Sequence, residues 1–198
     1  MVRFQLVNTT PVSNLVVVVV PDLGDIPPSA ILSEWRVLTP AAGGSSAFRF
    51  GGAIQAIVSD GRTSTAPTAA PLGSLLPVTT APNGGLLFGA RVSGNDPSVA
   101  AVRNDSTDDK LLTVRWRVDG AKVLTQHGLN QKAVANLALT RTLQFFTRDL
   151  AAGLAALDFP GIVSQITSYT IPDAVTSVKV TWSRDSAAGA DTFTFAAR

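Results

Sequence analysis

The sequence predicts an all-β protein made of two tandem, internally repeated antiparallel β-sandwich halves, immunoglobulin-like or jelly-roll-like, with one short helix. Two observations support this fold class. Short runs rich in Val, Ile, Thr and Phe recur about every 8–12 residues between clusters of Gly, Pro, Asn and Asp, a pattern typical of sandwiches and barrels. In addition, parts of the first half of the chain recur in the second half.

The internal repeat relates matching positions by two shifts. Asn8 matches Asn104 and Leu15 matches Leu111, at a shift of 96 residues. At a shift of 89 residues the matching pairs are Phe48 with Leu137, Phe50 with Leu139, Gln55 with Gln144 and Asp60 with Asp149. We therefore predict one sandwich over residues 1–95 and a second over 96–198, and we interpret the shared positions as turn and core residues.

The apolar runs predict a series of short strands along the whole chain. We expect them at 2–8, 14–20, 33–38, 46–50, 53–58, 86–92, 98–104, 111–118, 121–127, 132–139, 141–147, 163–170, 174–182 and 190–196. The run from Leu15 to Val20 is apolar on both faces, so we expect the other half of the chain or another subunit to cover its outer face.

The strand at 111–118 shows the clearest alternation. Trp116 and its apolar neighbours two residues away should face inward, while Arg115 and Arg117 face outward. The Asp119-Gly120 dipeptide that follows predicts a two-residue hairpin turn. This hairpin brings Lys122 across from the arginines.

The short helix is predicted after Asp149, which can cap its first turn. Leu150, Leu154 and Leu157 would lie on one helical face, and Pro160-Gly161 would end the run. The alternative interpretation is a loop that packs on a sheet through its leucines.

The two copies differ most at three places, and we expect any specialised role to lie there. The first copy carries an insertion at 21–32, followed by Trp35, where the second copy has only a short turn. The segment 59–82 is rich in Thr, Ala, Pro, Gly and Ser and predicts a long surface loop or an interdomain connection. The third place is the arginine-bearing hairpin at 115–122.

The composition favours a protein with little surface charge. Charged residues make up 15% of the 198 residues, well below the usual quarter, and the net charge is +2. A surface with few charges is easily desolvated, which favours contacts with partner subunits, although a neutral extracellular β-protein is an equal alternative.

The chain has no cysteine, so disulfides and thiol chemistry are excluded. No signal peptide or membrane-spanning run is visible, and the compartment stays open.

No combination of residues predicts an enzyme. His127 is the only histidine, and the chain has no G-x-S-x-G nucleophile elbow. A glycoside hydrolase would need Glu34, the only glutamate, to face a second acid such as Asp22 or Asp25, with Trp35 as a sugar platform. Trp35 as an ordinary core residue is the alternative interpretation.

The main prediction is that the protein has no cofactor. Calcium is the only cofactor that the acidic loops suggest. Asp22 with Asp25, and the Asn/Asp-rich loop at 104–109, offer the hard oxygen ligands that calcium prefers. Neither loop has the EF-hand spacing, and Asp and Asn also serve ordinary turn geometry.

The hairpin at 115–122 carries several basic residues. Arg115, Arg117 and Lys122 could contact phosphates, with Trp116 for base stacking. Trp116 should point away from these cations, however, and the chain has no basic arm. We therefore do not expect nucleic acid as the partner. The main interpretation is a solvated strand face, or pairing of these cations with Asp across the strands.

The function predicted from the sequence is that of a non-catalytic, self-assembling structural protein, a homo-oligomeric subunit of a particle, coat, capsid or surface layer. The alternative is a module that binds carbohydrate or another ligand through the loops at the ends of the sandwiches. For either role, the candidate contact residues are Asp22, Asp25, Glu34, Trp35, Arg115, Arg117 and Lys122.

Overall fold

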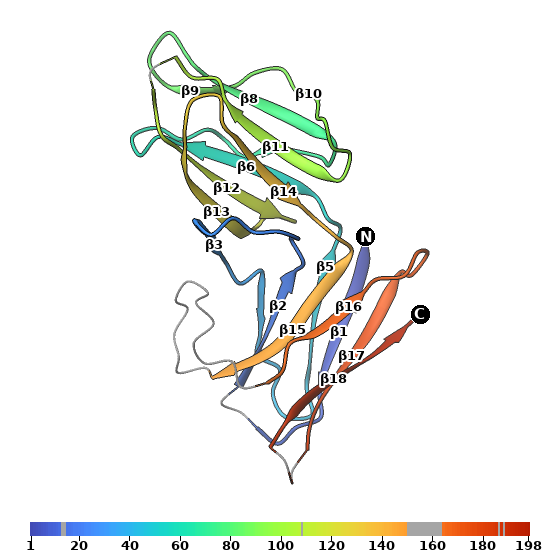
Figure 1. The fold of residues 1–198 in the computed structure, drawn as a ribbon. Helices are drawn as coiled ribbons and strands as arrows, with labels where there is room; N and C mark the ends of the chain where they lie inside the picture. Colours follow the sequence, from blue (N-terminus) through green and yellow to red (C-terminus); the bar gives the residue numbers. More distant parts are fainter. Residues whose placement is uncertain (13–14, 108, 150–163, 186, 188) are drawn as a thin grey trace. The chain divides into compact units, whose positions relative to one another are not determined.

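The computed structural model confirms that the chain is all-β (Figure 1). The structure describes residues 1–12, 15–107, 109–149, 164–185, 187 and 189–198. Within these residues there are strands β1 to β18 and no helix, and so none that could cross a membrane. The helix predicted after Asp149 lies outside the described residues.

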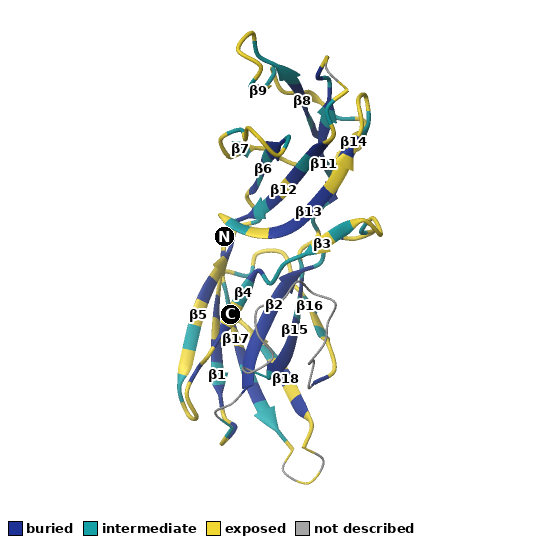
Figure 2. Cartoon of the chain, turned by 90° about the vertical axis from the view of Figure 1, so that its left-hand side faces the viewer, coloured by how far each residue is buried: buried dark blue, intermediate teal, exposed yellow. Residues whose placement is uncertain are grey.

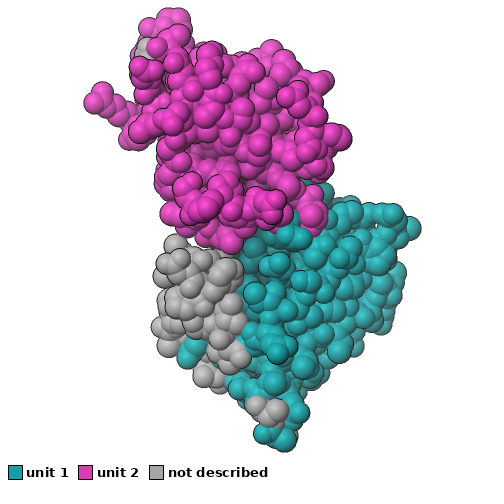
Figure 3. Space-filling model, viewed as in Figure 1, with its two compact units in different colours: residues 1–22, 34–52, 141–198 teal, residues 23–33, 53–140 magenta. Residues whose placement is uncertain are grey.

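The chain divides into two compact units, coloured separately in Figure 3. Unit 1 contains residues 1–22, 34–52 and 141–198, and unit 2 contains residues 23–33 and 53–140. This division differs from the predicted one at residue 95, because each unit takes strands from both halves of the chain.

Unit 1 contains two four-stranded sheets. The first has the order β18 (Asp191–Ala197), β17 (Ser177–Arg184), β1 (Val2–Asn8) and β5 (Ser45–Phe50). The second has the order β16 (Thr167–Thr170), β15 (Thr142–Asp149), β2 (Leu15–Pro21) and β4 (Arg36–Leu38). All neighbours are antiparallel except β1 and β17, which are parallel.

Unit 2 contains two five-stranded sheets. The first has the order β10 (Val92–Ser93), β8 (Ser74–Thr80), β11 (Val99–Asn104) and β14 (Val134–Ala138), with β9 (Leu86–Phe88) also paired to β8. The second has the order β3 (Ala30–Leu32), β13 (Ala121–Leu129), β12 (Leu112–Val118), β6 (Ile54–Ser59) and β7 (Thr68–Ala69). Here the parallel neighbours are β11 and β8.

The two units share one connectivity. In each, a parallel pair forms the centre of one sheet, β1 with β17 in unit 1 and β11 with β8 in unit 2. The strand that follows, β2 or β12, lies in the other sheet between two antiparallel neighbours, β15 and β4 or β6 and β13. Strands β15 to β18 of the second half thus occupy in unit 1 the places that β6 to β9 of the first half occupy in unit 2.

The sequence shifts relate residues in matching structural positions. Phe48 lies opposite Phe4 in unit 1, and Leu137 lies opposite Ala100 in unit 2. Phe48 and Leu137 are 89 positions apart, and Phe4 and Ala100 are 96 positions apart.

One predicted match, Leu15 with Leu111, is wrong by one residue. Leu15 is 7% exposed and Leu111 is 61% exposed, whereas Leu112 is fully buried. Val20 lies opposite Gln144, and Arg117 lies opposite Gln55. Val20 and Arg117 are 97 positions apart, although the two glutamines match at the expected shift of 89. The connection after Asn104 is therefore one residue longer than the connection after Asn8, and a slip of one residue turns a strand side chain to the other face.

Aromatic side chains fill the core of unit 1. Phe145 of β15 lies 6.4 Å from the ring centroids of both Phe4 and Phe48, which belong to the other sheet. It also contacts Phe193 and Phe195 of β18 at 5.9 Å and 5.1 Å. The two sheets of this unit therefore share one core, and burying such rings contributes about 1.5–3 kcal/mol each.

The structure confirms the two strand predictions that rested on side-chain pattern. All residues of β2 are buried, as its colour in Figure 2 shows. Val16, Val18 and Val20 cluster with Phe146 of β15 on the face opposite the aromatic core. Strands β12 and β13 form the predicted hairpin, with Asp119 and Gly120 at φ values of 48° and 78°.

The segment 59–82 differs from its prediction as a loop. It contains β7 and the seven-residue β8, which pairs with β11 at the centre of a sheet. The small and turn-forming residues around β8, and Pro77 within it, conceal an alternation in which Ser74, Leu76 and Val78 are buried. Beside Pro77 the edge partner is split into β9 and β10, and Gly89 N–H donates to the Pro77 carbonyl.

Candidate functional site

The structure brings Arg115, Arg117 and Lys122 together on the outer face of unit 2. Arg117 lies directly opposite Lys122 in the β12–β13 hairpin, and Arg115 lies two residues along on the same face. Arg115 and Lys122 are exposed and Arg117 is half-buried, while Trp116 between the arginines is fully buried. None of the three cations forms an ion pair within the described part of the chain.

Trp35 lies in the core of unit 1. It is 2% exposed and meets the rings of Phe48 and Phe50 edge-on, with centroid distances of 5.6 Å. The Arg36 guanidinium covers the indole at 4.3 Å. This packing leaves no open ring face for a sugar, and the indole supports β5 instead.

Glu34 forms a buried ion pair with Arg148 of β15. The Arg148 Nε lies 3.1 Å from Glu34 Oε1, and both side chains are less than a tenth exposed. Burial raises the pKa of the Glu34 carboxyl, and the charge of Arg148 acts in the opposite direction. This partner could not be predicted from the sequence, because the two residues are 114 positions apart.

The remaining acidic candidates fall in different places. Asp22 belongs to unit 1 and Asp25 to unit 2. In the loop at 104–109, Asp105 is bound by Arg103 at 2.7 Å and by Lys132 at 3.3 Å, which lowers the pKa of its carboxyl. Among the residues that the structure describes, no group of three or more His, Asp or Glu side chains is placed to hold a metal ion.

Asn8 and Asn104 end matching strands and have matching hydrogen bonds. Asn8 Oδ1 accepts from the N–H and the hydroxyl of Thr10, at 2.7 and 2.8 Å, and Asn104 Oδ1 accepts from the same groups of Ser106, at 3.1 and 2.6 Å. Each Nδ2 donates to a backbone carbonyl of a distant segment, Pro40 for Asn8 and Leu129 for Asn104. Both asparagines are fully buried, so their role is structural: they hold the turn that leads to the next strand.

The backbone around the two asparagines also matches. Gly43 N–H donates to the Asn8 carbonyl, and Lys132 N–H donates to the Asn104 carbonyl, at 2.9 and 2.7 Å. Gly43 and Lys132 are again 89 positions apart. Lys132 has a φ of 63°, in the left-handed region that Gly43 occupies more readily, so the second unit keeps this turn with a less suitable residue.

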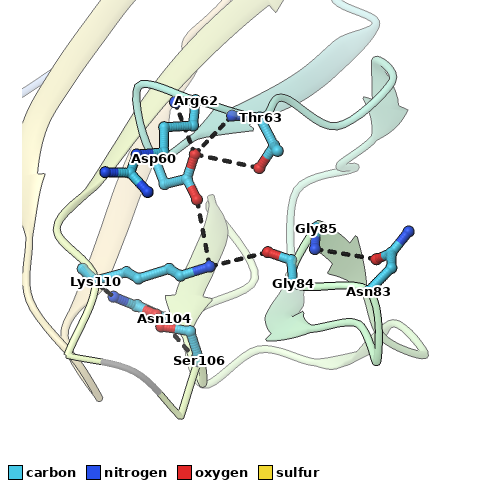
Figure 4. A network of polar contacts seen from close by, with 9 residues as sticks. All are labelled: Asp60, Arg62, Thr63, Asn83, Gly84, Gly85, Asn104, Ser106 and Lys110. Carbon is cyan, nitrogen blue, oxygen red and sulfur yellow. Dashed lines mark hydrogen bonds and ion pairs between the residues drawn. The ribbon is translucent and has the colours of Figure 1, made fainter.

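Asp60 and Lys110 connect three loops of unit 2, as Figure 4 shows. Lys110 Nζ lies 3.4 Å from Asp60 Oδ2 and donates to the Gly84 carbonyl at 2.9 Å. The Lys110 carbonyl accepts from Asn104 Nδ2 at 2.8 Å. Backbone N–H groups of Thr63 and Arg62 donate to Asp60 Oδ1, and these bonds, that of Thr63 above all, lower the pKa of Asp60 to about 2.

The Asp60 carboxylate should make the stability of unit 2 depend on pH. Because its pKa is lower in the folded state than in the unfolded chain, ionised Asp60 stabilises the fold above about pH 4, and this contribution is lost as the pH falls from about 4 to about 2. We expect the difference in unfolding free energy between wild type and Asp60→Asn to shrink over that range. Chemical denaturation at several pH values measures it, and a difference independent of pH would contradict this role.

A hollow of about 320 Å³, which we call the apolar groove, lies on the outer face of the β10-β8-β11-β14 sheet of unit 2. Its floor is formed by Leu75, Val99, Ala101 and Val134. Val134 is 45% exposed, and Val92 beside Leu75 is 48% exposed. An antiparallel sheet face in contact with water normally carries polar side chains, so this apolar surface is a candidate association site.

This groove was not predicted from the sequence. The available signal was the run Val99-Ala100-Ala101-Val102, which is apolar on both faces in the same way as Leu15 to Val20. Its partner β8 resembles a loop in sequence because of Pro77 and the small residues around it, so the continuous apolar face is not visible from the sequence.

His127 is exposed and lies 3.2 Å from the Thr113 hydroxyl. Among the hydrogen bonds of the described residues, none joins the His127 imidazole to a carboxylate. The buried acids have structural partners: Asp191 binds Trp182 Nε1 at 3.0 Å and the Thr147 hydroxyl at 2.8 Å. These contacts are those of a core polar network and do not prepare a nucleophile.

No family model matches the chain, and no curated protein or solved structure is significantly similar to it. Its function must therefore be inferred from the geometry of its own residues.

Proposed function

We propose that this chain is a non-catalytic structural protein that self-associates through the apolar groove of unit 2, as a subunit of a larger particle, coat or surface layer. The observation that carries the proposal is the outer face of the β10-β8-β11-β14 sheet. Leu75, Val99, Ala101 and Val134 form the apolar floor of the groove there, and Val92 is exposed beside Leu75. The occupant we propose is the same face of a second copy.

Charge around the groove supports a second copy as the occupant. Asp96 and Arg103 both line the groove, and Arg103, which also binds Asp105, keeps 39% of its side chain exposed. Two copies related by a twofold axis can bring the acid of one close to the arginine of the other, since an isologous interface repeats each contact twice. The low content of charged residues, 15%, reduces the cost of removing the surrounding surface from water.

A structural role also agrees with the ion pairs, which connect parts of the fold. Three ion pairs join distant segments of the fold: Glu34 with Arg148, Asp60 with Lys110, and Asp105 with Lys132. The ionisable groups with shifted pKa values thus stabilise turns and sheets.

We further propose that the chain arose by duplication of one repeat and that the two repeats exchange halves to form two β-sandwich units. The common connectivity of the units, the matching hydrogen bonds of Asn8 and Asn104, and the constant shifts of 96 and 89 residues support this. Such an exchange is the arrangement that domain swapping gives between separate copies, here within one chain.

Light scattering coupled to size-exclusion chromatography tests the proposed association. We expect the wild-type chain to form dimers or larger species at micromolar concentration, and Val134→Asp to shift it to monomer, because a carboxylate in the apolar hollow would be desolvated on association. The expected loss of affinity is at least about tenfold.

Val37→Asp is the matched control. Val37 is 37% exposed on strand β4 of unit 1, so the same substitution there changes charge equally and leaves the groove intact. A wild-type chain that remains a clean monomer at micromolar concentration would overturn the proposal, as would an equal effect of both substitutions.

A further inference from the structure

The outer face of the β18-β17-β1-β5 sheet of unit 1 is basic. Its strands alternate strictly: Phe4 and Val178 point into the core, and their neighbours Arg3, Arg49 and Lys179 are exposed. We propose that this face binds a linear anionic polysaccharide, one that carries sulfate or carboxylate groups.

The cations form a row across the sheet. Arg3 lies directly opposite Arg49 on one side and beside Ser177 on the other. Ser177 in turn pairs with Arg198, whose N–H donates to the Ser177 carbonyl at 2.9 Å. Because neighbouring strands are about 4.8 Å apart, the row from Arg49 to Arg198 spans about 14 Å.

A hollow of about 170 Å³ lies along this row, lined by Arg3, Gln5, Ser177, Lys179 and Arg198 among others. A space of this size is enough for one sulfate or carboxylate group with part of a sugar ring. The side chains around it supply both charge and neutral donors, since Gln5 lies beside Lys179 and Ser177 beside Arg3. The row therefore provides a continuous track for a chain with repeated negative groups.

No acidic side chain on the basic face neutralises its cations. None of the outward positions of these four strands carries an Asp or Glu side chain. Arg3, Arg49 and Lys179 form no ion pair within the part of the chain that the structure describes. Like charges directly opposite each other destabilise a sheet, so the Arg3–Arg49 pair is a stability cost that an anionic ligand would offset.

The other side chains on this face distinguish among polyanions. The face carries Ser, Thr, Gln and Ala and has no aromatic residue at an outward position. Single-stranded nucleic acid is normally held by stacking on aromatic rings, and duplex DNA is read by an element that enters a groove, which a flat sheet face does not offer. A membrane surface would favour large apolar or aromatic side chains that insert among the lipids. Hydroxyl and amide groups between cations suit a sulfated or uronic sugar chain.

Binding of a fluorescent heparin oligosaccharide, titrated at several salt concentrations, tests this assignment. We expect Arg3→Gln with Arg49→Gln to weaken binding by about tenfold or more and to reduce the salt dependence of the affinity. The substitutions remove a repulsive pair, so the variant should fold, which circular dichroism verifies. Binding at this face requires neither self-association nor the groove of unit 2.

Two variants with the same loss of charge serve as controls. Arg62→Gln with Arg91→Gln removes two exposed arginines of unit 2, and we expect it to leave binding within about twofold of wild type. Arg115→Gln with Arg117→Gln neutralises the basic hairpin and should have a smaller effect than the unit 1 variant. Equal losses in all variants, or a loss confined to the hairpin variant, would overturn the site. Equal or tighter binding of duplex DNA or of anionic vesicles would overturn the ligand class.

Discussion

Neither half of the chain should fold by itself when it is cut between residues 95 and 96. In fragment 1–95, β1 lacks its parallel neighbour β17, and β2 lacks β15. In fragment 96–198, β11 lacks β8 and β12 lacks β6. Each fragment therefore leaves strands of both units without a neighbour and contains only part of each core. We expect the purified fragments to be unfolded monomers or aggregates by circular dichroism and light scattering.

Mixing or co-expressing the two fragments should restore a folded 1:1 complex, because every strand then has its partner. A dimer of fragment 1–95 would also agree with the exchange, since β6 and β8 of one copy can take the places of β15 and β17 in the other. Cooperative folding of either fragment as a monomer would contradict the arrangement of strands described above.

Arg148→Ala should destabilise unit 1 by about 3–5 kcal/mol. The substitution leaves Glu34 buried, with no cation in place of the guanidinium that lies 3.1 Å away. Removing one partner of a buried ion pair costs this much because the remaining charge is neither solvated nor paired. The free energy of unfolding, measured by chemical denaturation at neutral pH, gives the effect directly.

A double variant and a change of pH separate charge from packing in this result. Glu34→Gln with Arg148→Met removes both charges at similar volume and should recover most of the lost stability. Burial already raises the pKa of Glu34, and loss of Arg148 removes the influence that lowers it. The destabilisation should therefore diminish as the pH falls and Glu34 becomes protonated. A loss that stays constant with pH and persists in the double variant would show that packing of Arg148, rather than charge, is responsible.

Local pattern was sufficient to predict much of the strand structure. The alternation around Trp116, the turn at Asp119-Gly120 and the two-sided burial of Leu15 to Val20 are all properties of neighbouring residues, and the structure agrees with them. The match of Asn8 with Asn104 was also visible, because a buried asparagine that holds a turn leaves the same short motif in both places.

Pairing between distant strands could not be predicted in the same way. Whether β1 adds β17 or β8 as its parallel neighbour depends on which cores fit together, and the two shifts of the repeat are equally compatible with both. The basic row of unit 1 was missed for the same reason: Arg3, Arg49 and Lys179 each lie between apolar residues, but only strand order places them side by side. Hairpin neighbours such as Arg117 and Lys122 were found because two residues connect their strands.

Cross-linking between positions 55 and 117 tests the exchange of halves most directly. The chain has no cysteine, so Gln55→Cys with Arg117→Cys introduces the only two thiols. These residues lie directly opposite each other on β6 and β12, although they come from different halves of the sequence. Arg117→Cys with Lys122→Cys is the control pair, because the β12–β13 hairpin brings those residues together whatever the long-range pairing.

We expect a short bis-maleimide to link both pairs rapidly within one chain, as mass spectrometry of the digested monomer would show. Efficient linkage of the control pair without linkage of positions 55 and 117 would contradict the exchange and would favour two separate domains over residues 1–95 and 96–198.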